Sequence, residues 1–254
     1  MANLYIVATP IGNLEDISLR ALRILKEVDL ILCEDTRVTK KLLNRYQIQK
    51  PLLSYHQHSK LQKINYIISL LKEGKNLALV SDSGTPGISD PGNKLISILV
   101  NEFMSNKKLK DSSTHQLINS LTIIPIPGPS ALTCAASVSG FPMNKFLFLG
   151  FLPKKKKRKE VLKEILESKY PVIFYESPYR IIKTLKELGS MNKELEIVVA
   201  KELTKKFETV YRGKVDKVIE ELEKSLVKGE FVVIVKSNHR QITAGQKRVF
   251  GGQN

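Results

Sequence analysis

The stretch "SDSGTPGISDPG", residues 81–92, follows the apolar run "NLALV" with no spacer. Five of its twelve residues are glycine or proline, so it is neither a helix nor a central strand. An ordinary turn between a strand and a helix needs only one or two such residues. The excess predicts a rigid loop whose backbone approaches a ligand closely, because loops held by a scaffold carry much of protein function.

The composition favours a negatively charged partner. The chain has 254 residues, of which 42% are hydrophobic, so it can form one large domain or two modest ones. Lysine and arginine number 41 against 25 aspartate and glutamate residues, a formal net charge of +16. This excess is typical of proteins that bind nucleic acid, an anionic membrane or a phosphorylated substrate. The alternative is a lysine-rich surface exposed to solvent with no such partner.

The sequence also indicates a compartment. Cys33 and Cys134, the only cysteines, lie in apolar settings, which predicts two buried thiols rather than a disulfide, and no metal-ligand spacing is present. The first ten residues, "MANLYIVATP", lack the positive segment of a signal peptide. No apolar run approaches the roughly eighteen residues that span a bilayer, so we expect a soluble cytoplasmic protein without membrane contact.

Short apolar runs alternate with amphipathic segments along the chain. Near-continuous apolar runs are typical of strands in sheets that are covered on both faces. They occupy residues 4–8, 28–33, 77–81, 121–126, 146–150, 172–177, 196–201 and 231–236. Between two of them, residues 59–73 place Leu61, Ile64, Ile67, Ile68 and Leu71 on one helical stripe. The alternation predicts an α/β fold.

Breaks in composition predict two α/β domains, residues 1–120 and 121–237, and a flexible polar tail at 238–254. The polar run at 103–119 interrupts the periodicity and is expected to be a surface insertion. Ligands of α/β proteins bind beyond the carboxyl ends of strands, so the loops at 9–13 and 81–87 are expected to lie together above one sheet. Neither loop has the glycine pattern of a dinucleotide site or a P-loop.

Charged residues follow three other predicted strands. Each set has a structural alternative, because such residues also cap helices and form ion pairs. Acid–base pairs at three strand ends nevertheless exceed what capping requires, and a functional role is expected if they converge on one cleft. The three sets are Glu34, Asp35 and Arg37; Glu176 and Arg180; and Lys201 and Glu202.

Taken together, these motifs resemble the tetrapyrrole methylase superfamily of S-adenosylmethionine (SAM) methyltransferases. The motifs are "ATPIGNLEDIS", "EDTR", "SDSGTPGISDPG", "PIPGPSAL", "LGFLP", "YESPYR", "AKELTK" and "GEFVVIV", in that order along most of the chain. More narrowly, the chain is similar to the branch that methylates the 2′-hydroxyl of a cytidine of 16S ribosomal RNA in the decoding centre. It departs from that branch where "HQHS" at 56–59 replaces "HEHN", where Tyr179 replaces a histidine, and at the apparent insertion.

The resemblance implies two α/β domains with SAM in the cleft between them, a homodimer, and 16S rRNA as partner, within the small ribosomal subunit. Asp82 is suited to accept a hydrogen bond from a ribose hydroxyl or from the methionine amine, with an Asx turn as the alternative. Many relatives continue beyond the last strand, so any RNA contact of that extension is expected to be absent or replaced. The residues carried onto the cofactor site are Pro10, Ser81, Asp82, Thr85, Ser130, Ala131, Tyr175, Glu176 and Ala200.

Transfer of a methyl group to a ribose needs an aligned hydroxyl and a group that takes its proton. The proton acceptor stays open among Glu34, Asp35, His56, Glu176, Lys201 and Glu202. A catalytic wall on the substrate side is expected to comprise Glu34, Arg37, Glu176, Arg180 and Glu202.

The basic run directly after "FLP" is predicted to contact RNA phosphates, in a manner that is sensitive to salt and carries no sequence information. The alternative is the solvated start of a helix. The run comprises Lys154, Lys155, Lys156, Lys157, Arg158 and Lys159. Two other functions stay open: a SAM-dependent methyltransferase acting on a small molecule such as a precorrin or on a protein side chain, and a non-catalytic RNA-binding assembly factor.

Overall fold

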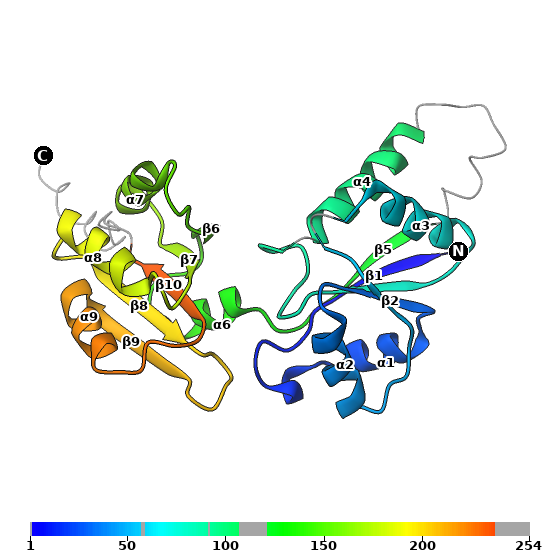
Figure 1. The fold of residues 1–254 in the computed structure, drawn as a ribbon. Helices are drawn as coiled ribbons and strands as arrows, with labels where there is room; N and C mark the ends of the chain where they lie inside the picture. The colour runs from blue at the N-terminus through cyan, green and yellow to red at the C-terminus, as the bar shows by residue number, and fades with distance from the viewer. Residues whose placement is uncertain (1, 57–58, 91, 107–120, 237–254) are drawn as a thin grey trace, which may run out of the picture. The chain divides into compact units, whose positions relative to one another are not determined.

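The computed structural model describes residues 2–56, 59–90, 92–106 and 121–236 (Figure 1). The chain divides into two compact units, Met1–Cys134 and Ala135–Asn254, and each contains its own five-stranded sheet. The predicted α/β class is confirmed. Residues 107–119 of the predicted insertion and the predicted tail at 238–254 lie outside the described residues, whereas residues 103–106 continue a helix.

The first unit has a parallel sheet with the strand order β3-β2-β4-β1-β5. Its strands are β1 (Asn3–Val7), β2 (Leu30–Cys33), β3 (Leu52–Ser54), β4 (Leu77–Val80) and β5 (Thr122–Ile126). A 3-10 turn, η1 (Leu14–Asp16), precedes the helices α1 (Leu19–Glu27), α2 (Thr36–Arg45), α3 (Leu61–Lys72) and α4 (Gly92–Asn106). Because the strands are parallel, their carboxyl ends open on one edge.

Helices cover both faces of this first sheet. Val7 of β1 packs in a cluster with residues of α1 and α2, whereas Leu4 of the same strand packs with residues of α3 and α4. The alternation follows from the period of two in a strand, which sends successive side chains to opposite faces. The stripe predicted on α3 is buried at Ile64, Ile67, Ile68 and Leu71, and only its first member, Leu61, is exposed.

The structure moves the predicted boundary between the domains. Strand β5 follows residue 120, yet it pairs in parallel with β1 from Asn3↔Thr122 to Val7↔Ile126 and so belongs to the first sheet. The first unit consequently ends at Cys134. The polar run before β5 interrupts the periodicity of the sequence without ending the sheet, because β1 still has an edge whose backbone groups need partners.

The second unit has a mixed sheet with the order β6-β7-β10-β8-β9. Its strands are β6 (Leu147–Phe151), β7 (Val172–Glu176), β8 (Glu196–Lys201), β9 (Thr209–Lys214) and β10 (Phe231–Val235). β6 is parallel to β7, and β10 is antiparallel to both β7 and β8. β6, β7 and β8 therefore end at one edge, which we call the carboxyl edge of the second sheet.

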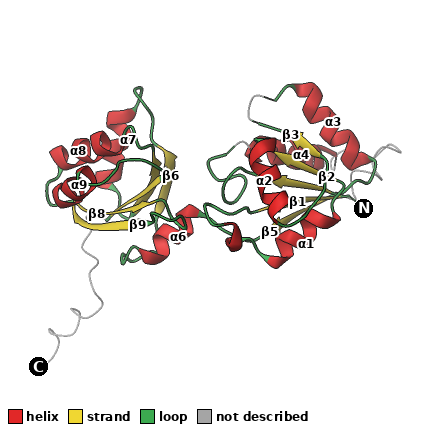
Figure 2. Cartoon of the chain, turned by 60° about the horizontal axis from the view of Figure 1, so that its bottom comes forward, coloured by secondary structure: helices red, strands yellow, loops and turns green. Residues whose placement is uncertain are grey.

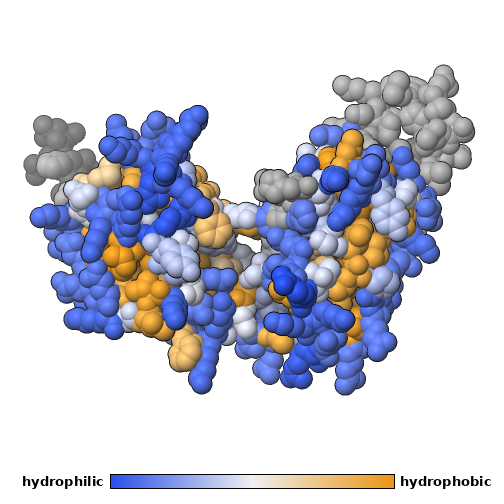
Figure 3. All heavy atoms as spheres, viewed as in Figure 1, coloured by the Kyte–Doolittle hydropathy of each residue, from blue (hydrophilic) through white to orange (hydrophobic). Residues whose placement is uncertain are grey.

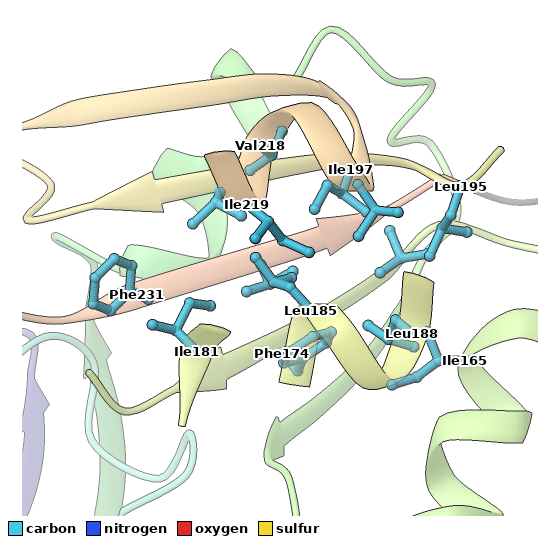
Figure 4. Close-up of a cluster of buried hydrophobic side chains, with 14 of the residues drawn as sticks. Ile165, Phe174, Ile181, Leu185, Leu188, Leu195, Ile197, Val218, Ile219 and Phe231 are labelled. Carbon is cyan, nitrogen blue, oxygen red and sulfur yellow. The ribbon is translucent and has the colours of Figure 1, made fainter. Parts of the chain in front are cut away.

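Three helices pack on one face of this second sheet, α7 (Arg158–Glu167), α8 (Ile181–Met191) and α9 (Val215–Glu223) (Figure 2). They enclose a buried cluster in which Phe174 of β7 lies among Leu185 and Leu188 of α8 and Ile219 of α9 (Figure 4). The remaining helix, α6 (Ala131–Val138), comes directly after the loop that follows β5. Among the described residues, no helix combines the length and hydrophobicity that a membrane span requires.

All eight predicted strands are present, within a residue or two of the predicted bounds. The two strands that the sequence did not reveal are β3, which has three residues, and β9, which has a mostly polar sequence at the sheet edge. Cys33 and Cys134 form no disulfide, as predicted; Cys33 is buried, whereas Cys134, which was also predicted to be buried, is half-buried.

We expect Phe174→Ala to lower the free energy of unfolding of the second unit by about 3–5 kcal/mol, because the substitution leaves a cavity at the centre of its core. Urea denaturation followed by circular dichroism measures the change. Leu226→Ala is the control, since that side chain is 69% exposed and its loss should change the free energy by less than about 0.5 kcal/mol. Equal stability of the two variants would contradict this view of the core.

Candidate functional site

Two loops of the first unit are joined by backbone hydrogen bonds at the carboxyl edge of its sheet. The N–H of Thr9 donates to the carbonyl of Gly84 at 2.9 Å, and the N–H of Gly84 donates back to Thr9 at 3.1 Å. The Thr9 hydroxyl also donates to the carbonyl of Ser81 at 3.0 Å, and the Ser81 hydroxyl donates to Gly84 at 3.1 Å. The predicted neighbourhood of loops 9–13 and 81–87 is therefore confirmed.

A third loop, residues 127–130, follows β5 and lies against the other two. We call these three loops together the corner of the first unit. The Thr85 hydroxyl donates to the carbonyl of Pro129 at 3.1 Å. Gly128 lies so near β1 that an added Cβ would stand 2.9 Å from the Cβ of Ala8. Gly84 adopts a φ of +83°, in the left-handed region, and an added Cβ there would lie 3.3 Å from Ile11. These contacts explain the breaker-rich sequence: the three loops approach one another more closely than ordinary side chains allow.

The loop then leads directly into α4. Asp90 accepts hydrogen bonds from the N–H groups of Gly87 at 2.6 Å and Gly92 at 2.8 Å through the same oxygen, Oδ1. Gly92 is the first residue of α4, so Asp90 supplies an acceptor to one of the N–H groups at the start of this helix, which have no partner within it. The whole stretch 81–92 is fixed at both ends, and it presents its backbone and the carboxylate of Asp82 at the sheet edge.

Asp82 meets the loop that follows β2. Its Oδ1 accepts a hydrogen bond from the N–H of Asp35 at 3.0 Å, which orients the carboxylate and leaves Oδ2 without a partner among the described residues. Glu34, the neighbour of Asp35, is half-buried. Burial, and then the negative charges of Asp82 and Asp90, raise the pKa of the Glu34 carboxyl. The edge thus carries three carboxylates of differing environment, Glu34, Asp82 and Asp90.

Asp35 and Arg37 take the structural role that the sequence left open. Asp35 is the N-cap of α2 and accepts from the N–H of Arg37 at 2.8 Å, while the Arg37 guanidinium contacts the same carboxylate at 2.6 Å. These hydrogen bonds lower the pKa of Asp35 to about 2. The side chain of Arg37 is 86% exposed. A carboxyl with so low a pKa is a poor proton acceptor, so Asp35 is not suited to be the base.

The second unit contains a buried network of charges at the end of β7. The Glu176 side chain is fully buried; it accepts from Arg180 at 2.7 Å, from the N–H of Ser177 at 2.8 Å and from the hydroxyl of Thr184 at 2.8 Å. Both of its oxygens are therefore used inside the unit. These contacts give Glu176 a structural role inside the unit, and its place in the predicted wall on the substrate side stays a prediction.

Arg158 belongs to the same network. Its guanidinium donates to Thr184 at 2.7 Å, to Glu187 at 2.8 Å and to the carbonyl of Pro153 at 3.0 Å. Only 10% of the side chain is exposed, which gives Arg158 a structural role in the unit, and its predicted contact with RNA stays a prediction. Because Arg180 donates to the carbonyl of Leu152 at 3.0 Å, the two arginines together hold the start of the basic run. Lys154, Lys155, Lys156, Lys157 and Lys159 are exposed.

The loop after β8 takes an unusual backbone path. Glu202 and Thr204 have φ angles of 52° and 66°, in the left-handed region that these residue types rarely occupy. Burial opposes ionisation of Glu202, but the N–H of Glu230 and the ammonium of Lys205 outweigh it and hold the pKa of Glu202 below its usual value. Lys201 is buried and donates to the carbonyl of Leu226 at 2.6 Å. Neither Lys201 nor Glu202 is therefore suited to be the proton acceptor.

The remaining predicted residues occupy varied environments. Pro10 and Ala200 are buried, Ser130 and Ala131 are half-buried beside the third loop, and His56 is exposed after β3. Tyr175 packs its ring edge-on against Phe148 and Phe151, with centroids 5.1 and 5.4 Å apart. Among the proposed bases, Glu34 alone combines partial burial with a raised pKa. The roles of Arg158 and Thr184 were missed because their partners lie 26–29 residues away in the sequence.

Solved structures with the same fold include methyltransferases of several kinds. A diphthine synthase matches with a TM-score of 0.66 at 14% identity, covering 93% of this chain and 90% of that one. The methyltransferase CobJ matches with a TM-score of 0.60 at 17% identity, covering 94% and 95%. At this level of identity the likeness concerns the fold.

Closer relatives cover nearly the whole sequence. A protein of Mycoplasmopsis pulmonis is 48% identical over 236 residues, which are 92% of this chain and 97% of the relative. One of Thermotoga maritima is 45% identical over 235 residues, or 92% and 98%. One of Bacillus subtilis is 41% identical over 242 residues, or 95% and 77%. Each is named Ribosomal RNA small subunit methyltransferase I.

The family model described as Tetrapyrrole (Corrin/Porphyrin) Methylases matches residues 3–219, a range that includes all three loops of the first corner and the charge network of the second unit. The cofactor of these enzymes is SAM. The chain therefore belongs to the tetrapyrrole methylase family and is a SAM-dependent methyltransferase.

Proposed function

We propose that the protein transfers a methyl group from SAM to the 2′-hydroxyl of a cytidine of 16S rRNA, in the decoding centre of the small ribosomal subunit. The rRNA substrate is supported by the name of the relatives at 41–48% identity and by the net charge of +16. We further expect the protein to act in the cytoplasm and as a homodimer.

The observation that carries the choice of a hydroxyl acceptor is the position of Glu34 beside the Asp82 loop. A ribose hydroxyl is a poor acid and needs a base before it attacks a methyl group, whereas a more nucleophilic nitrogen does not. A carboxyl whose pKa is raised accepts a proton better than an ordinary one. Glu34 lies in the loop after β2. The N–H of Asp35 in this loop donates a hydrogen bond to Asp82, so Glu34 and Asp82 keep fixed positions relative to each other.

The residues of the first corner fit SAM. Its ribose hydroxyls and amine are donors, and Oδ2 of Asp82 is an acceptor without a partner among the described residues. Gly84 and Gly128 remove the side chains that would fill the corner. Pro10, Ser81, Thr85 and Ser130 belong to the same three loops, Ala131 begins α6 directly after the third loop, and we propose that all five line the cofactor. Tyr175, Glu176 and Ala200 of the second unit stay predictions in this role.

When bound, SAM supplies an electrophilic methyl group on a positively charged sulfur. The protein's own contribution is to hold the ribose hydroxyl in line with that methyl, which is worth roughly 7–11 kcal/mol of the barrier, and to let Glu34 accept the hydroxyl proton. The two backbone hydrogen bonds between Thr9 and Gly84 keep the three loops in position when the substrate binds. Among the remaining wall residues, Arg37 is exposed beside Asp35, and Arg180 and Glu202 are held in ion pairs within the second unit.

The function is tested by methyl transfer from labelled SAM to small ribosomal subunits that lack the modification, with mapping of the product by mass spectrometry. We expect one methyl group on the 2′-oxygen of a 16S cytidine. Transfer to a base, to a protein or only to a small molecule would refute the proposal. SAM binding without any transfer to subunits or to free rRNA would favour a binding protein instead.

Glu34→Gln is expected to lower kcat by about 10²–10⁴-fold and to leave the affinity for SAM unchanged, because the amide cannot accept the proton. In the native enzyme, activity should fall as the pH drops through the raised pKa of Glu34, since protonation removes the base. That acidic limb should lie above the usual range near 4.3 and vanish in the variant. Glu27→Gln, on the exposed surface of α1, serves as the control. An unchanged kcat in Glu34→Gln would exclude this base.

Replacing Lys154, Lys155, Lys156 and Lys157 by glutamine is expected to flatten the salt dependence of RNA binding. Each phosphate contact with a single strand contributes about 0.7 to the slope of log K against log salt, so the slope should fall by up to about 3. Arg158 is left in place because it is part of the buried network. Glutamine at the exposed Lys72 and Lys75, before β4, is the control. An identical slope in the fourfold variant would assign these lysines to ordinary surface.

A further inference from the structure

Three exposed aromatic rings lie at the carboxyl edge of the second sheet. Phe151 is the last residue of β6, Tyr179 follows the end of β7 by three residues, and Phe207 lies in the loop that joins β8 to β9. Their exposed fractions are 59%, 95% and 70%, the highest of any aromatic residues that the structure describes. Single exposed rings are common on protein surfaces, but three rings with the highest exposed fractions at one sheet edge need an explanation.

The strand pairing places these rings together. β6, β7 and β8 run in the same direction, and Lys201 at the end of β8 pairs with Thr209 at the start of β9, so the loop 202–208 leaves and re-enters the sheet at this edge. From β6 to β8 there are three strand spacings, about 14 Å in total. That span corresponds to about four nucleotides at the 3.4 Å step of a stacked strand.

Two of the rings have a neighbouring group. The ring of Phe151 packs edge-on against Tyr175 at 5.4 Å, and the ammonium of Lys206 lies 5.6 Å from the centre of the Phe207 ring. A packed ring such as Phe151 loses little conformational entropy when a base stacks on it. The left-handed φ angles of Glu202 and Thr204 set the path of the loop that carries Phe207.

Positive charge accompanies the rings. Lys154–Lys157 come directly after Phe151, Leu152 and Pro153, and none of these lysines pairs with a carboxylate in the described part of the chain. Of the acidic groups near the edge, Glu176 pairs with Arg180, Glu202 and Glu230 share Lys205, and Glu208 accepts a hydrogen bond from the N–H of Thr204, so the four lysines of the run outnumber the acidic groups that lack a countercharge. The edge is therefore positive as well as aromatic. The face in Figure 3 shows hydrophobic residues interspersed with hydrophilic ones over the second unit.

We propose that this aromatic and basic edge, comprising Phe151, Tyr179, Phe207 and Lys154–Lys157, binds single-stranded RNA by stacking unpaired bases on the rings while the lysines contact the phosphates. Aromatic rings offer a stacking surface to any base, and a duplex keeps its bases stacked on one another and unavailable. The proposal rests on the proposed rRNA substrate and adds to it that the second unit recognises an unpaired segment.

A second copy of the chain fits the edge less well. A symmetric contact would bring the same unpaired lysines of both copies together, and like charges in an interface are unfavourable. An anionic membrane would accept both rings and lysines, but a membrane-binding surface is typically one continuous amphipathic helix, whereas these rings come from three separate segments of the chain. RNA accounts for the separation of the rings and for the charge between them.

The test measures RNA affinity by fluorescence anisotropy of the full-length chain, with a labelled single-stranded RNA of mixed sequence and a hairpin of equal length. Phe151→Leu, Tyr179→Leu and Phe207→Leu are made singly and together; each is expected to weaken single-strand binding at least about fivefold. The slope of affinity against salt should stay unchanged, because leucine removes a stacking surface and no charge. The hairpin should bind more weakly than the single strand and respond less to the substitutions.

The control is Phe146→Leu with Tyr170→Leu, two less exposed rings that precede β6 and β7 at the opposite edge of the same sheet, where Lys145 lies 5.8 Å from Tyr170. This variant should bind RNA as the native chain does. Circular dichroism and SAM affinity verify folding, and Tyr179→Leu, at a ring that is 95% exposed, leaves the core untouched.

Native affinity in the triple variant would overturn the proposal while leaving the methyltransferase assay on subunits unaffected, so the two failures are distinguishable. Equal affinity for the hairpin and the single strand would also overturn it. The proposal would also be overturned if the substitutions abolished only the binding of phosphatidylserine vesicles, which would indicate a membrane surface. A change only in the sedimentation of the protein would overturn it as well, because it would indicate an interface between two copies. Absence of single-strand binding by the native chain would refute this inference, whereas methyl transfer to the small subunits decides the proposed substrate.

Discussion

The first unit depends on the pair of backbone hydrogen bonds between Thr9 and Gly84. These bonds join the loop after β1 to the loop after β4 at the edge where the parallel strands end. Gly84 has a φ of +83°, and a Cβ added there would lie 3.3 Å from Ile11. A larger residue would therefore be both strained and crowded at this position. The hydroxyls of Thr9, Ser81 and Thr85 then tie the corner to its own backbone and to Pro129. A corner built in this way is rigid before any cofactor arrives, which reduces the entropy lost on binding.

The second unit contains a network of buried charged side chains. Glu176 and Arg158 would each be costly to bury alone, but Arg180, Thr184 and Glu187 satisfy their hydrogen bonds. The network joins the end of β7 to α8 and, through the carbonyls of Leu152 and Pro153, to the start of the basic run. Glu176 and Arg180, which look catalytic in the sequence, thus belong to a network that holds the start of the exposed lysine run. Function in such a unit resides in the loops that the scaffold supports, which agrees with the presence of this fold in a diphthine synthase and in CobJ.

The contrast between Glu34 and Asp35 illustrates how environment separates neighbouring carboxyls. Asp35 caps α2 and pairs with Arg37, which lowers its pKa to about 2, whereas burial and the charges of Asp82 and Asp90 raise the pKa of Glu34. One carboxylate thereby has a structural role, and the other accepts a proton more readily than an ordinary carboxylate does. The sequence lists the two residues side by side and gives no sign of this division.

The sequence by itself determined the α/β class, eight of the strands and the rigid loop at 81–92, because apolar runs and clusters of glycine and proline act locally on the backbone. It did not reveal that β5 completes the first sheet, that Arg158 and Glu176 face inward, or that Phe151, Tyr179 and Phe207 share one edge. Only the tertiary structure decided these points. Each depends on partners far away along the chain, such as Thr184 for Arg158 or β1 for β5, and no local pattern encodes which distant residue will satisfy a buried charge or an open sheet edge.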